Sequence, residues 1–405
     1  MTAIVTIILI ILGIAISIAL HELGHLIPAK IFHVPVTEYF IGFGPTLFAK
    51  KVGETLCGVK LIWLGGYTKI VGMFPNKNIG IKHSKLGIAW DKRFENIITS
   101  ARQESLDEVT SDIEPRAFYN LTCGKKIVVM LGGILTNLFL GFLCFVLAFT
   151  VIGGSQPVPT VEKMSAVTGT VEPAKEAGLE VGDKIIKIND TQIDNWQKLL
   201  DTVNGLKSPD AKIVYERNGE EKETTIHAEK DMNGAYKFGI QAATEPIHAT
   251  LGESAAITLS TTLMTAAAIV TIPVQLFNTI KTLLTGGERS SSLVSIVGLG
   301  EVAVASTTQG ESTPAQKFAG IVSLIGSLNI ALFIFNLIPL LPFDGGQAVN
   351  AIYEGLKRGI AKIRKKPRPA PSDLARSMPV SYFVWGILII MSIILILADI
   401  VNPIV

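Results

Sequence analysis

Two histidines and a glutamate in the run HELGH form a candidate metal site at the end of an apolar segment. His21 and His25 are four positions apart, so on a helix their imidazoles project from one face and can reach a single ion. Glu22 lies beside them, where it can take a proton from a water on that ion. The pattern predicts a zinc-dependent hydrolase. The alternative is a pair of histidines satisfied by hydrogen bonds inside a helix bundle.

A third metal ligand is expected elsewhere, because catalytic zinc usually has three protein ligands and one open position. Asp344, in FNLIPLLPFDGGQ, closes an apolar segment just as the histidines close theirs. The four remaining histidines lie outside the apolar segments. An ordinary turn after a helix is the alternative for Pro-Phe-Asp-Gly-Gly, because Asp-Gly is common in turns. The position at equivalent membrane depth favours Asp344 as the third ligand.

The composition is that of a membrane protein. Of the 405 residues, 48% are hydrophobic and only 17% are charged, with a mean hydropathy of +0.45, whereas soluble domains carry about 25% charged residues. The first apolar run has no preceding Lys or Arg and no small-residue cleavage site after it, which predicts a retained span. A net charge of +2 gives no indication of nucleic acid as a partner, and three cysteines give no disulfide framework.

Four apolar segments are long enough to cross a bilayer, since a spanning helix needs about 20 residues. They are Ile4–Ala29, Ile127–Gly153, Phe318–Leu341 and Tyr382–Val401. The connections after the first and third segments are rich in Lys and Arg, so both are predicted to be cytoplasmic. The more acidic connection between the second and third segments, and both termini, are then expected on the outer side.

Residues 255–284 are also apolar but rich in Ser and Thr. We expect one or two amphipathic helices lying along the outer surface there. His21 and Asp344 can share one ion only if their two spans run in the same direction, which requires an odd number of crossings between them. A crossing at 255–284 would make that number even, so the metal site favours the surface position.

With these residues in place, the chain resembles the site-2 protease family of intramembrane zinc metalloproteases, especially bacterial members that cut anti-sigma factors. The matching stretches are HELGH, YFIGFGPTLF, VKLIWLGGYTKIVGM, the run from Asn336 to the Gly pair, and VNPI near the end. The resemblance implies zinc at His21, His25 and Asp344, with Glu22 as the general base. It also implies that Asn336 and Pro339 lie near the substrate.

The chain departs from this family in its second span. Many relatives have Gly-Pro ahead of an Asn, where this chain has GGILTN with Ile134 and Asn137. The departure concerns the local helix geometry rather than the zinc ligands.

Residues 36–72 are predicted to form strands in VTEYFIG, PTLFAKK and TLCGVKLIWL, with turns at Gly42–Pro45 and Gly53–Glu54. A small sheet that only packs against the helices is one alternative. The other is an edge strand beside the zinc that pairs with an unwound substrate segment. The family contains a membrane-re-entrant hairpin whose tip GFGP matches, which implies substrate contact by Gly42, Phe43 and Gly44. Residues 75–115 are a polar, partly helical insertion with no evident chemistry.

Residues 155–247 resemble a PDZ domain of the bacterial protease type, with AGLEVGD as the most specific run and a helix around Asn195–Val203. PDZ domains bind extended peptides by strand addition. A filter that excludes bulky ectodomains without binding a peptide tail is the alternative, because these enzymes generally accept substrates already trimmed by a first protease.

Together these features predict an α-helical polytopic membrane protein: a four-span zinc metalloprotease core with a membrane-associated β-sheet and an inserted extracytoplasmic PDZ domain. The expected order is a first span (1–30), a β region with a polar insertion (31–126), a second span (127–154), the PDZ domain (155–247), a membrane-surface segment (248–316), a third span (317–347), a basic cytoplasmic loop (348–378) and a fourth span (379–405).

The expected activity is zinc-dependent cleavage of single-span membrane proteins in a bacterial plasma membrane. Anti-sigma factors and signal-peptide remnants, including products of a prior site-1 cleavage, are the expected substrates. Two other classes stay open: a non-proteolytic membrane scaffold that binds through the PDZ domain, and a different membrane metallohydrolase such as a prenyl-protein endopeptidase. The intact metal motif argues against the scaffold, and the PDZ domain argues against the second enzyme class.

Overall fold

The computed structural model describes residues 3–75, 85–167, 172–231, 234–285, 298 and 313–401. It divides the chain into two compact units, one of Met1–Ile152 with Ala249–Val405 and one of Gly153–His248. Apart from residue 298, the stretch 286–312 lies outside the described residues. It belongs to the segment predicted at the membrane surface. Residues 402–405, which hold most of the VNPI run, also lie outside them.

Long apolar helices build the first unit. They are α1 (Ala3–Ile31), α4 (Cys123–Phe145, continued by a π-helix over Val146–Gly153), α7 (Leu251–Thr285), α9 (Pro314–Leu337) and α11 (Met378–Val401, preceded by a 3-10 turn over Leu374–Ser377). Length and composition qualify five helices of the described chain as candidate membrane spans. A helix satisfies all its backbone hydrogen bonds internally, which is what a segment in lipid requires. The chain is therefore a polytopic membrane protein.

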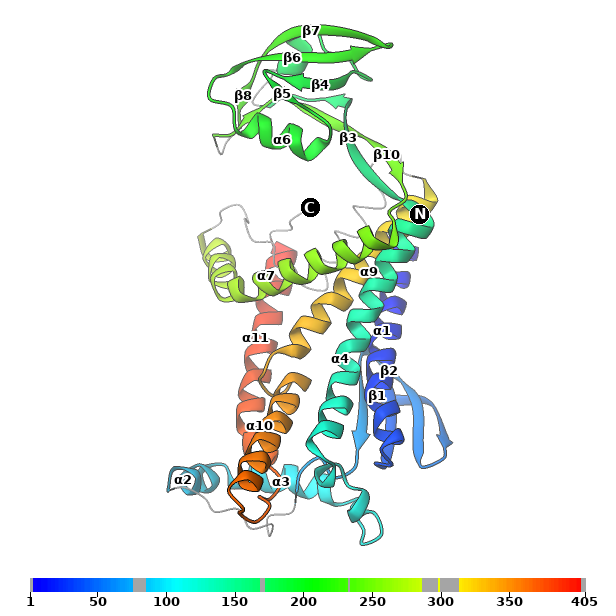
Figure 1. Cartoon of the computed structure of the whole chain (residues 1–405), viewed down its shortest axis with the longest axis vertical. Coiled ribbons are helices and arrows are strands. Elements are labelled where there is room, and N and C mark those ends of the chain that lie inside the picture. Colours follow the sequence, from blue (N-terminus) through cyan, green and yellow to red (C-terminus); the bar gives the residue numbers. More distant parts are fainter. Residues whose placement is uncertain are drawn as a thin grey trace. The chain divides into compact units, whose positions relative to one another are not determined.

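The helices alternate in direction. Figure 1 shows α1 and α9 running one way and α4 and α11 the other way. α1 and α9 are joined by a buried hydrogen bond in which Asn329 Nδ2 donates to Ser17 Oγ at 2.8 Å. Polar contacts between small and amide side chains hold helices together in lipid. The parallel course of α1 and α9 brings the end of α9 to the same side as the end of α1, as the shared ion requires.

α7 covers residues 255–284, where one or two helices are expected. It is one continuous helix of 35 residues with Pro273 inside it, and it is apolar enough to count as a fifth candidate span. Figure 1 shows α7 bent along its length and crossing the ends of α4 and α9 rather than running beside them. Proline removes a backbone donor inside a helix, which accounts for a bend without a break.

The predicted boundaries around Asp344 are wrong in two respects. α9 ends at Leu337, so Asp344 does not close the third span but is the first residue of a new helix, α10 (Asp344–Ile363). A Cβ on Gly345 would lie 2.5 Å from the Leu337 carbonyl oxygen, so only glycine lets α10 start folded back on the end of α9. The segment 348–378, expected as a basic loop, is helical up to Ile363.

A sheet formed by two long, bent strands lies beside α1. β1 (Val36–Val52) and β2 (Thr55–Ile70) meet in a hairpin turn at Gly53–Glu54, as predicted. The first half of β1 pairs on both sides, since Phe40 faces both Tyr67 and Gly58. The resulting order is 66–70, 36–41, 55–60 and 46–52. The sheet therefore has outer edges at 66–70 and 46–52, and Gly42–Pro45 is a bend in β1 at the end opposite the hairpin turn.

The polar insertion is largely helical where it is described. It contains α2 (Lys85–Arg93), α3 (Glu95–Leu106) and 3-10 turns over Glu114–Arg116 and Phe118–Asn120. A buried ion pair between Arg102 and Asp373 connects α3 to the chain just before α11. The insertion thus packs against the start of α11 and the 3-10 turn that precedes it.

The second unit has its own sheet and core. Its sheet order is β10-β3-β4-β6-β7, with β5 paired to β4, and β8 pairs with β9. The strands are β3 (Gly154–Met164), β4 (Lys184–Ile188), β5 (Thr191–Gln192), β6 (Asp210–Arg217), β7 (Glu220–His227), β8 (Glu229–Lys230), β9 (Tyr236–Lys237) and β10 (Ile240–Ile247); the helices are α5 (Pro173–Glu176) and α6 (Trp196–Asn204). Ile185, Leu199 and Ile213 are buried at its centre. This unit covers the stretch whose sequence resembles a PDZ domain, and we refer to it as the PDZ-like unit.

An ion pair fixes the AGLEVGD run of this unit. Arg217 donates from Nε and Nη2 to the two Asp183 oxygens, each at 2.7 Å. Burial of Asp183 opposes its ionisation, but these hydrogen bonds outweigh burial and hold the pKa of its carboxyl below the usual value. Asp183 also accepts from the Glu180 backbone N–H at 2.8 Å, so it shapes the turn that the run encodes.

Candidate metal centre

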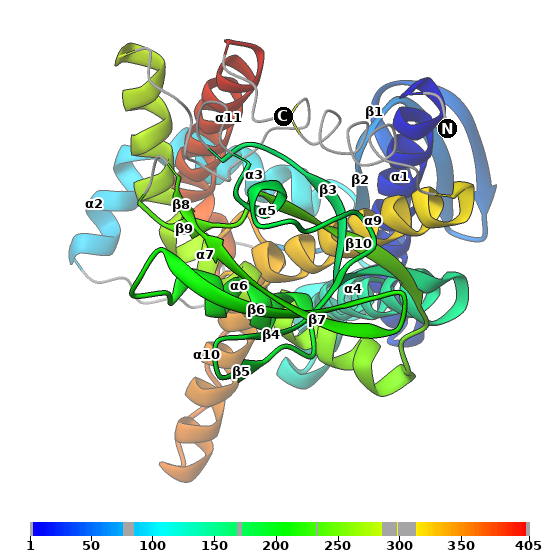
Figure 2. The same cartoon turned by 90° about the horizontal axis from the view of Figure 1, so that it is seen from above.

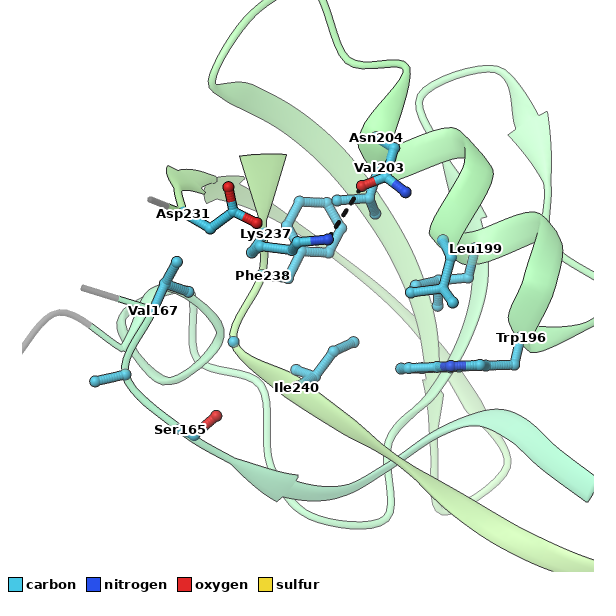
Figure 3. Close-up of a pocket in the computed structure, with 13 residues that line it drawn as sticks. Ser165, Val167, Trp196, Leu199, Val203, Asn204, Asp231, Lys237, Phe238 and Ile240 are labelled. Carbon is cyan, nitrogen blue, oxygen red and sulfur yellow. Dashed lines mark hydrogen bonds between the residues drawn. The ribbon is translucent and has the colours of Figure 1, made fainter. Parts of the chain in front are cut away.

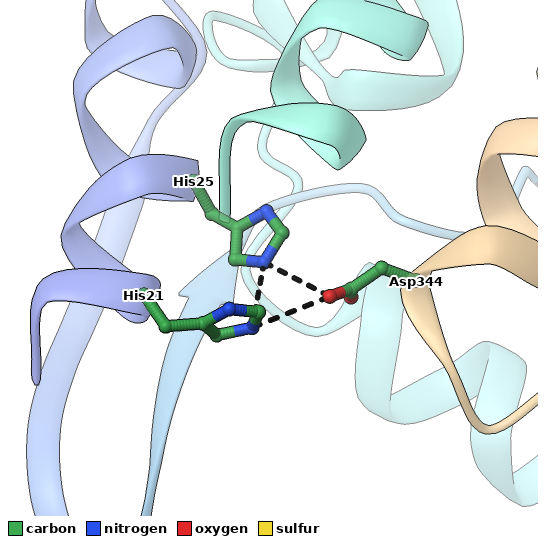
Figure 4. A group of neighbouring side chains, drawn as sticks. All are labelled: His21, His25 and Asp344. Atoms are coloured by element: carbon green, nitrogen blue, oxygen red, sulfur yellow. Dashed lines mark hydrogen bonds and ion pairs between the residues drawn. The ribbon is translucent and has the colours of Figure 1, made fainter. Parts of the chain in front are cut away.

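Three side chains predicted as metal ligands converge in the first unit. His21 and His25 project from one face of α1 toward Asp344 at the start of α10 (Figure 4). Asp344 Oδ2 lies 3.3 Å from His21 Nε2 and 3.2 Å from His25 Nε2, and the two Nε2 atoms are 3.2 Å apart. His25 is buried, and the other two side chains are partly accessible.

These separations fit one zinc ion. Ligand atoms about 2.0–2.1 Å from zinc at tetrahedral angles lie roughly 3.3–3.4 Å from one another. All three measured distances match the edges of such a tetrahedron. Three protein ligands leave one position for water or substrate, which is the arrangement of a catalytic rather than a structural zinc.

α4 orients His25. Its Nδ1 lies 2.8 Å from the Val129 carbonyl oxygen, so Nδ1 carries the proton and donates it, leaving Nε2 free for the metal. A Cβ on Gly133 would lie 2.2 Å from His25 Nε2, so the second glycine of GGILTN makes room for the imidazole. This gives a physical reason for glycine in that run.

Asn137 on α4 orients His21, and sequence analysis did not assign it this role. Its amide lies 3.0 Å from His21 Nδ1 with nitrogen facing the ring, while its Oδ1 is buried and has no partner among the described residues. Zinc on Nε2 requires a proton on His21 Nδ1, which must then donate. Turning the amide by 180° places Oδ1 on that proton and satisfies both groups. The sequence feature that could have indicated this role is the run GGILTN, which ends in Asn137.

Replacing Asn137 with leucine is expected to weaken zinc binding about 10- to 100-fold, the usual cost of losing an outer-shell partner. Asn137→Asp keeps an acceptor oxygen and should retain most of the affinity. Competition with a chelator measures both values on purified protein. Equal zinc affinity for Asn137→Leu and the wild type would contradict this role.

Glu22 is on α1, and its side chain faces the sheet. Gly66 of β2 packs against Ile18 and Glu22, and Thr68 Oγ1 donates to the Glu22 carbonyl oxygen at 3.2 Å. No ion pair of Glu22 with another described side chain was found. Glu22 is therefore suited to proton transfer, because its carboxylate lies next to the two histidines and is not held in an ion pair by a described side chain.

The residues predicted to contact substrate lie on different elements. Asn336 is in the last turn of α9, and Pro339 lies between α9 and α10. Gly42, Phe43 and Gly44 lie at the bend of β1, where the Phe43 ring packs over Gly65. The roles of these five residues stay predictions.

The second unit carries a separate pocket of about 260 Å³ beside α6 (Figure 3). Trp196, Leu199 and Val203 from α6 form one wall, and Phe238 and Ile240 form another. Lys237 Nζ donates to Asn204 Oδ1 at 3.2 Å across its rim. The pocket is apolar with a polar rim, a form that suits an apolar side chain.

Comparison with known proteins identifies a family and related proteins for this chain. The model of peptidase family M50 matches residues 9–368. Zinc metalloprotease Rip1 of Mycolicibacterium smegmatis is 28% identical over 98% of this chain and 97% of its own length. Zinc metalloprotease RasP of Geobacillus kaustophilus is 27% identical over 83% of this chain and 86% of its own length. A structural match to the solved PDZ domain of the SdrC-like protein from Listeria monocytogenes covers 22% of this chain and 88% of the solved chain. The identity is 22% and the TM-score is 0.17.

The family match spans both the HELGH helix and the Asp344 turn, whose ligand atoms meet at zinc-compatible distances. The chain therefore belongs to peptidase family M50 and is a membrane zinc metalloprotease.

Proposed function

We propose that this protease cuts single-span membrane proteins within or next to their spans, in regulated intramembrane proteolysis. Anti-sigma factors and signal-peptide remnants whose outer parts a first protease has already removed are the substrate class. The observation that carries the proposal is that His21 and His25 on the apolar helix α1 meet Asp344, which starts α10 just after the apolar helix α9. Polar groups at membrane depth are costly and are retained for function.

The roles of the residues follow from their positions. His21, His25 and Asp344 would hold zinc, which when bound would supply a Lewis acid for the scissile carbonyl and make a bound water more acidic. Glu22 takes the proton of the attacking water and passes it to the leaving amine nitrogen. Asn336 hydrogen-bonds the substrate backbone near the end of α9.

The outer edge 66–70 of the sheet is where an extended substrate segment adds as a strand. Thr68 fixes this edge to α1 beside Glu22. Tyr39, the partner of Thr68 on the neighbouring strand of β1, adds a second tie, because its hydroxyl donates to the Ala19 carbonyl oxygen at 2.8 Å. A hollow of about 350 Å³ runs along Thr68 and Lys69 and is bounded by α3 and by Met378 at the start of α11. Strand addition exposes the peptide bond that a helix shields by its own hydrogen bonds.

The bend at Gly42–Pro45 supports a re-entrant position for the far end of the sheet. Large apolar side chains there are exposed, among them Phe43, Leu61 and Ile62. Irregular backbone survives at membrane depth only when protein or water surrounds it. The other half of the sheet packs against α1 and supplies that cover.

For the topology, we propose four crossings by α1, α4, α9 and α11, with α7 along the outer surface. The parallel course of α1 and α9 and the crosswise course of α7 support this count (Figure 1). The basic residues on the loops after α1 and α9 then face the cytoplasm of a bacterial cell, and the PDZ-like unit and both termini lie outside.

A reconstituted cleavage assay tests the proposed activity. The full chain with zinc is placed in proteoliposomes with a single-span reporter that carries a short outer stub. Mass spectrometry of the products should place the cut within or next to the apolar span. A cut in a soluble segment far from the span, or cleavage of prenylated peptides instead, would contradict the proposal.

Replacing residues 155–247 with a short Gly-Ser linker tests the PDZ-like unit as a size filter. Gly154 pairs with Ile247, the last residue removed, so a short linker from Gly154 to His248 joins the ends without strain. We expect cleavage of a reporter with a large ectodomain to rise from background toward the rate of the trimmed reporter. Trp196→Ala, which removes part of the wall of the pocket beside α6 and keeps the unit in place, should change neither rate. Slower cleavage of the trimmed reporter by both variants would instead assign the unit a peptide-binding role.

A further inference from the structure

A cationic hollow of about 570 Å³ lies between the start of α4 and the second half of α10. Its lining includes Arg358 and Lys362 from α10 and Lys366 and Arg368 from the chain that follows. No carboxylate is among its lining residues. It is separate from the metal ligands, because Arg358 is four turns of α10 away from Asp344.

The nearby carboxylate, Glu354, is already neutralised. It is buried and forms ion pairs with Lys126 at 2.9 Å and with Arg358 at 2.6 Å. It also accepts from the Ser372 backbone N–H at 3.2 Å. Two cations thus share one anion, which leaves an excess positive charge before Lys362, Lys366 and Arg368 are counted. Arg358 Nε is buried without a hydrogen-bond partner in the described structure, so donor capacity remains.

The amino end of α4 adds to this positive field. α4 starts at Cys123, and its N-cap residue Thr122 makes no side-chain cap hydrogen bond. The first backbone N–H groups of a helix lack partners within the helix and carry partial positive charge. Thr122 and Cys123 both line the hollow, so these donors and the four cationic side chains surround the same space.

α10 also carries an exposed apolar stripe, which a small free anion would leave uncovered. Its members recur at helical spacing and are between 45% and 83% exposed: Val349, Ile352, Tyr353, Leu356, Ile360 and Ile363. Figure 2 shows α10 projecting away from the other helices of its unit. A helix with an apolar stripe next to a cationic face is typical of the boundary between lipid headgroups and acyl chains.

We infer that the hollow binds the phosphate of an anionic phospholipid whose acyl chains cover the α10 stripe. The inference rests on the proposed topology, which puts the start of α4 and the end of α10 at the cytoplasmic membrane surface. Basic pockets at that level between membrane helices suit anionic headgroups. Phosphatidylglycerol supplies the required charge and chains, and phosphatidylcholine, with no net charge, does not.

Native mass spectrometry of the full zinc-loaded chain in detergent tests the inference. Phosphatidylglycerol, phosphatidylcholine and inorganic phosphate are each titrated alone, and inorganic phosphate is also titrated against bound phosphatidylglycerol. Phosphatidylglycerol should bind saturably and more tightly than phosphatidylcholine, while inorganic phosphate should compete weakly. The double variant Lys362→Gln/Arg368→Gln should lose about 25-fold in affinity, from about fivefold per cation. Lys357→Gln removes the same kind of charge from α10 outside the hollow and should bind like the wild type.

Several outcomes would overturn the inference. They are equal affinity for both lipids, unchanged binding by the double variant, binding of inorganic phosphate alone, and a lipid-free dimer that buries the stripe. The readout does not pass through proteolysis. A protein that binds lipid as expected yet cleaves no membrane substrate would contradict the proposed function alone, and the reverse result would contradict this inference alone.

Discussion

Glu22→Gln is expected to lower the cleavage rate about 10²- to 10⁴-fold while zinc stays bound. General acid–base catalysis contributes a factor of this size, and glutamine cannot accept the proton of the attacking water. Glu22 has no role as a metal ligand, because the three ligand atoms come from His21, His25 and Asp344. Cleavage of a single-span reporter and the zinc content of the purified chain are measured together.

Glu162→Gln provides a matched control, since Glu162 is an exposed carboxylate on β3 of the other unit. It should cleave and bind zinc like the wild type. Normal cleavage by Glu22→Gln would remove the assigned base. Loss of zinc from this variant would show instead that Glu22 supports the metal site.

The second large effect is expected from the ligands themselves. His25→Ala and Asp344→Ala should each weaken zinc binding by more than about 100-fold, beyond the 10- to 100-fold cost of losing an outer-shell partner. Each change removes one corner of a site whose ligand atoms lie 3.2–3.3 Å apart. Elemental analysis after dialysis measures the metal, and the reporter assay should show cleavage at background.

His227→Ala is the control for histidine loss, because His227 lies on β7 and pairs with Asp210 rather than with a metal ligand. It should keep both zinc and cleavage. Full metal content and turnover in Asp344→Ala would exclude Asp344 as the third ligand and with it the proposed centre. Restored cleavage on adding zinc to chelator-treated wild type would tie activity to the ion.

Much of the metal site could be predicted because its signals are local. The spacing of His21 and His25 fixes both imidazoles on one helix face whatever the surroundings. The long apolar runs predicted spanning helices. Asp344 was predicted as the third ligand because it follows an apolar segment, as His21 and His25 do. The hairpin turn at Gly53–Glu54 could also be predicted, because turn residues separate two runs rich in β-branched residues.

Features that depend on distant contacts could not be predicted. Asp344 was expected to end one helix and instead starts another, because the steric fit of Gly345 against Leu337 is visible only in three dimensions. Asn137 is separated from His21 by more than a hundred positions, and only helix packing brings its amide to the ring. The pairing of β1 on both of its sides likewise reflects bends that strand periodicity does not encode.

The sequence by itself determined the chemistry. Residue types and short spacings gave a helix with two zinc ligands, a carboxylate just after another apolar segment, and the composition of a membrane protein. Only the tertiary structure decided how the imidazoles are oriented, which strand edge lies beside Glu22, and where the cationic side chains of α10 gather. The reason is physical. Residue type and periodicity fix which groups a single helix or strand can present, whereas distances between groups on different elements arise only when those elements pack.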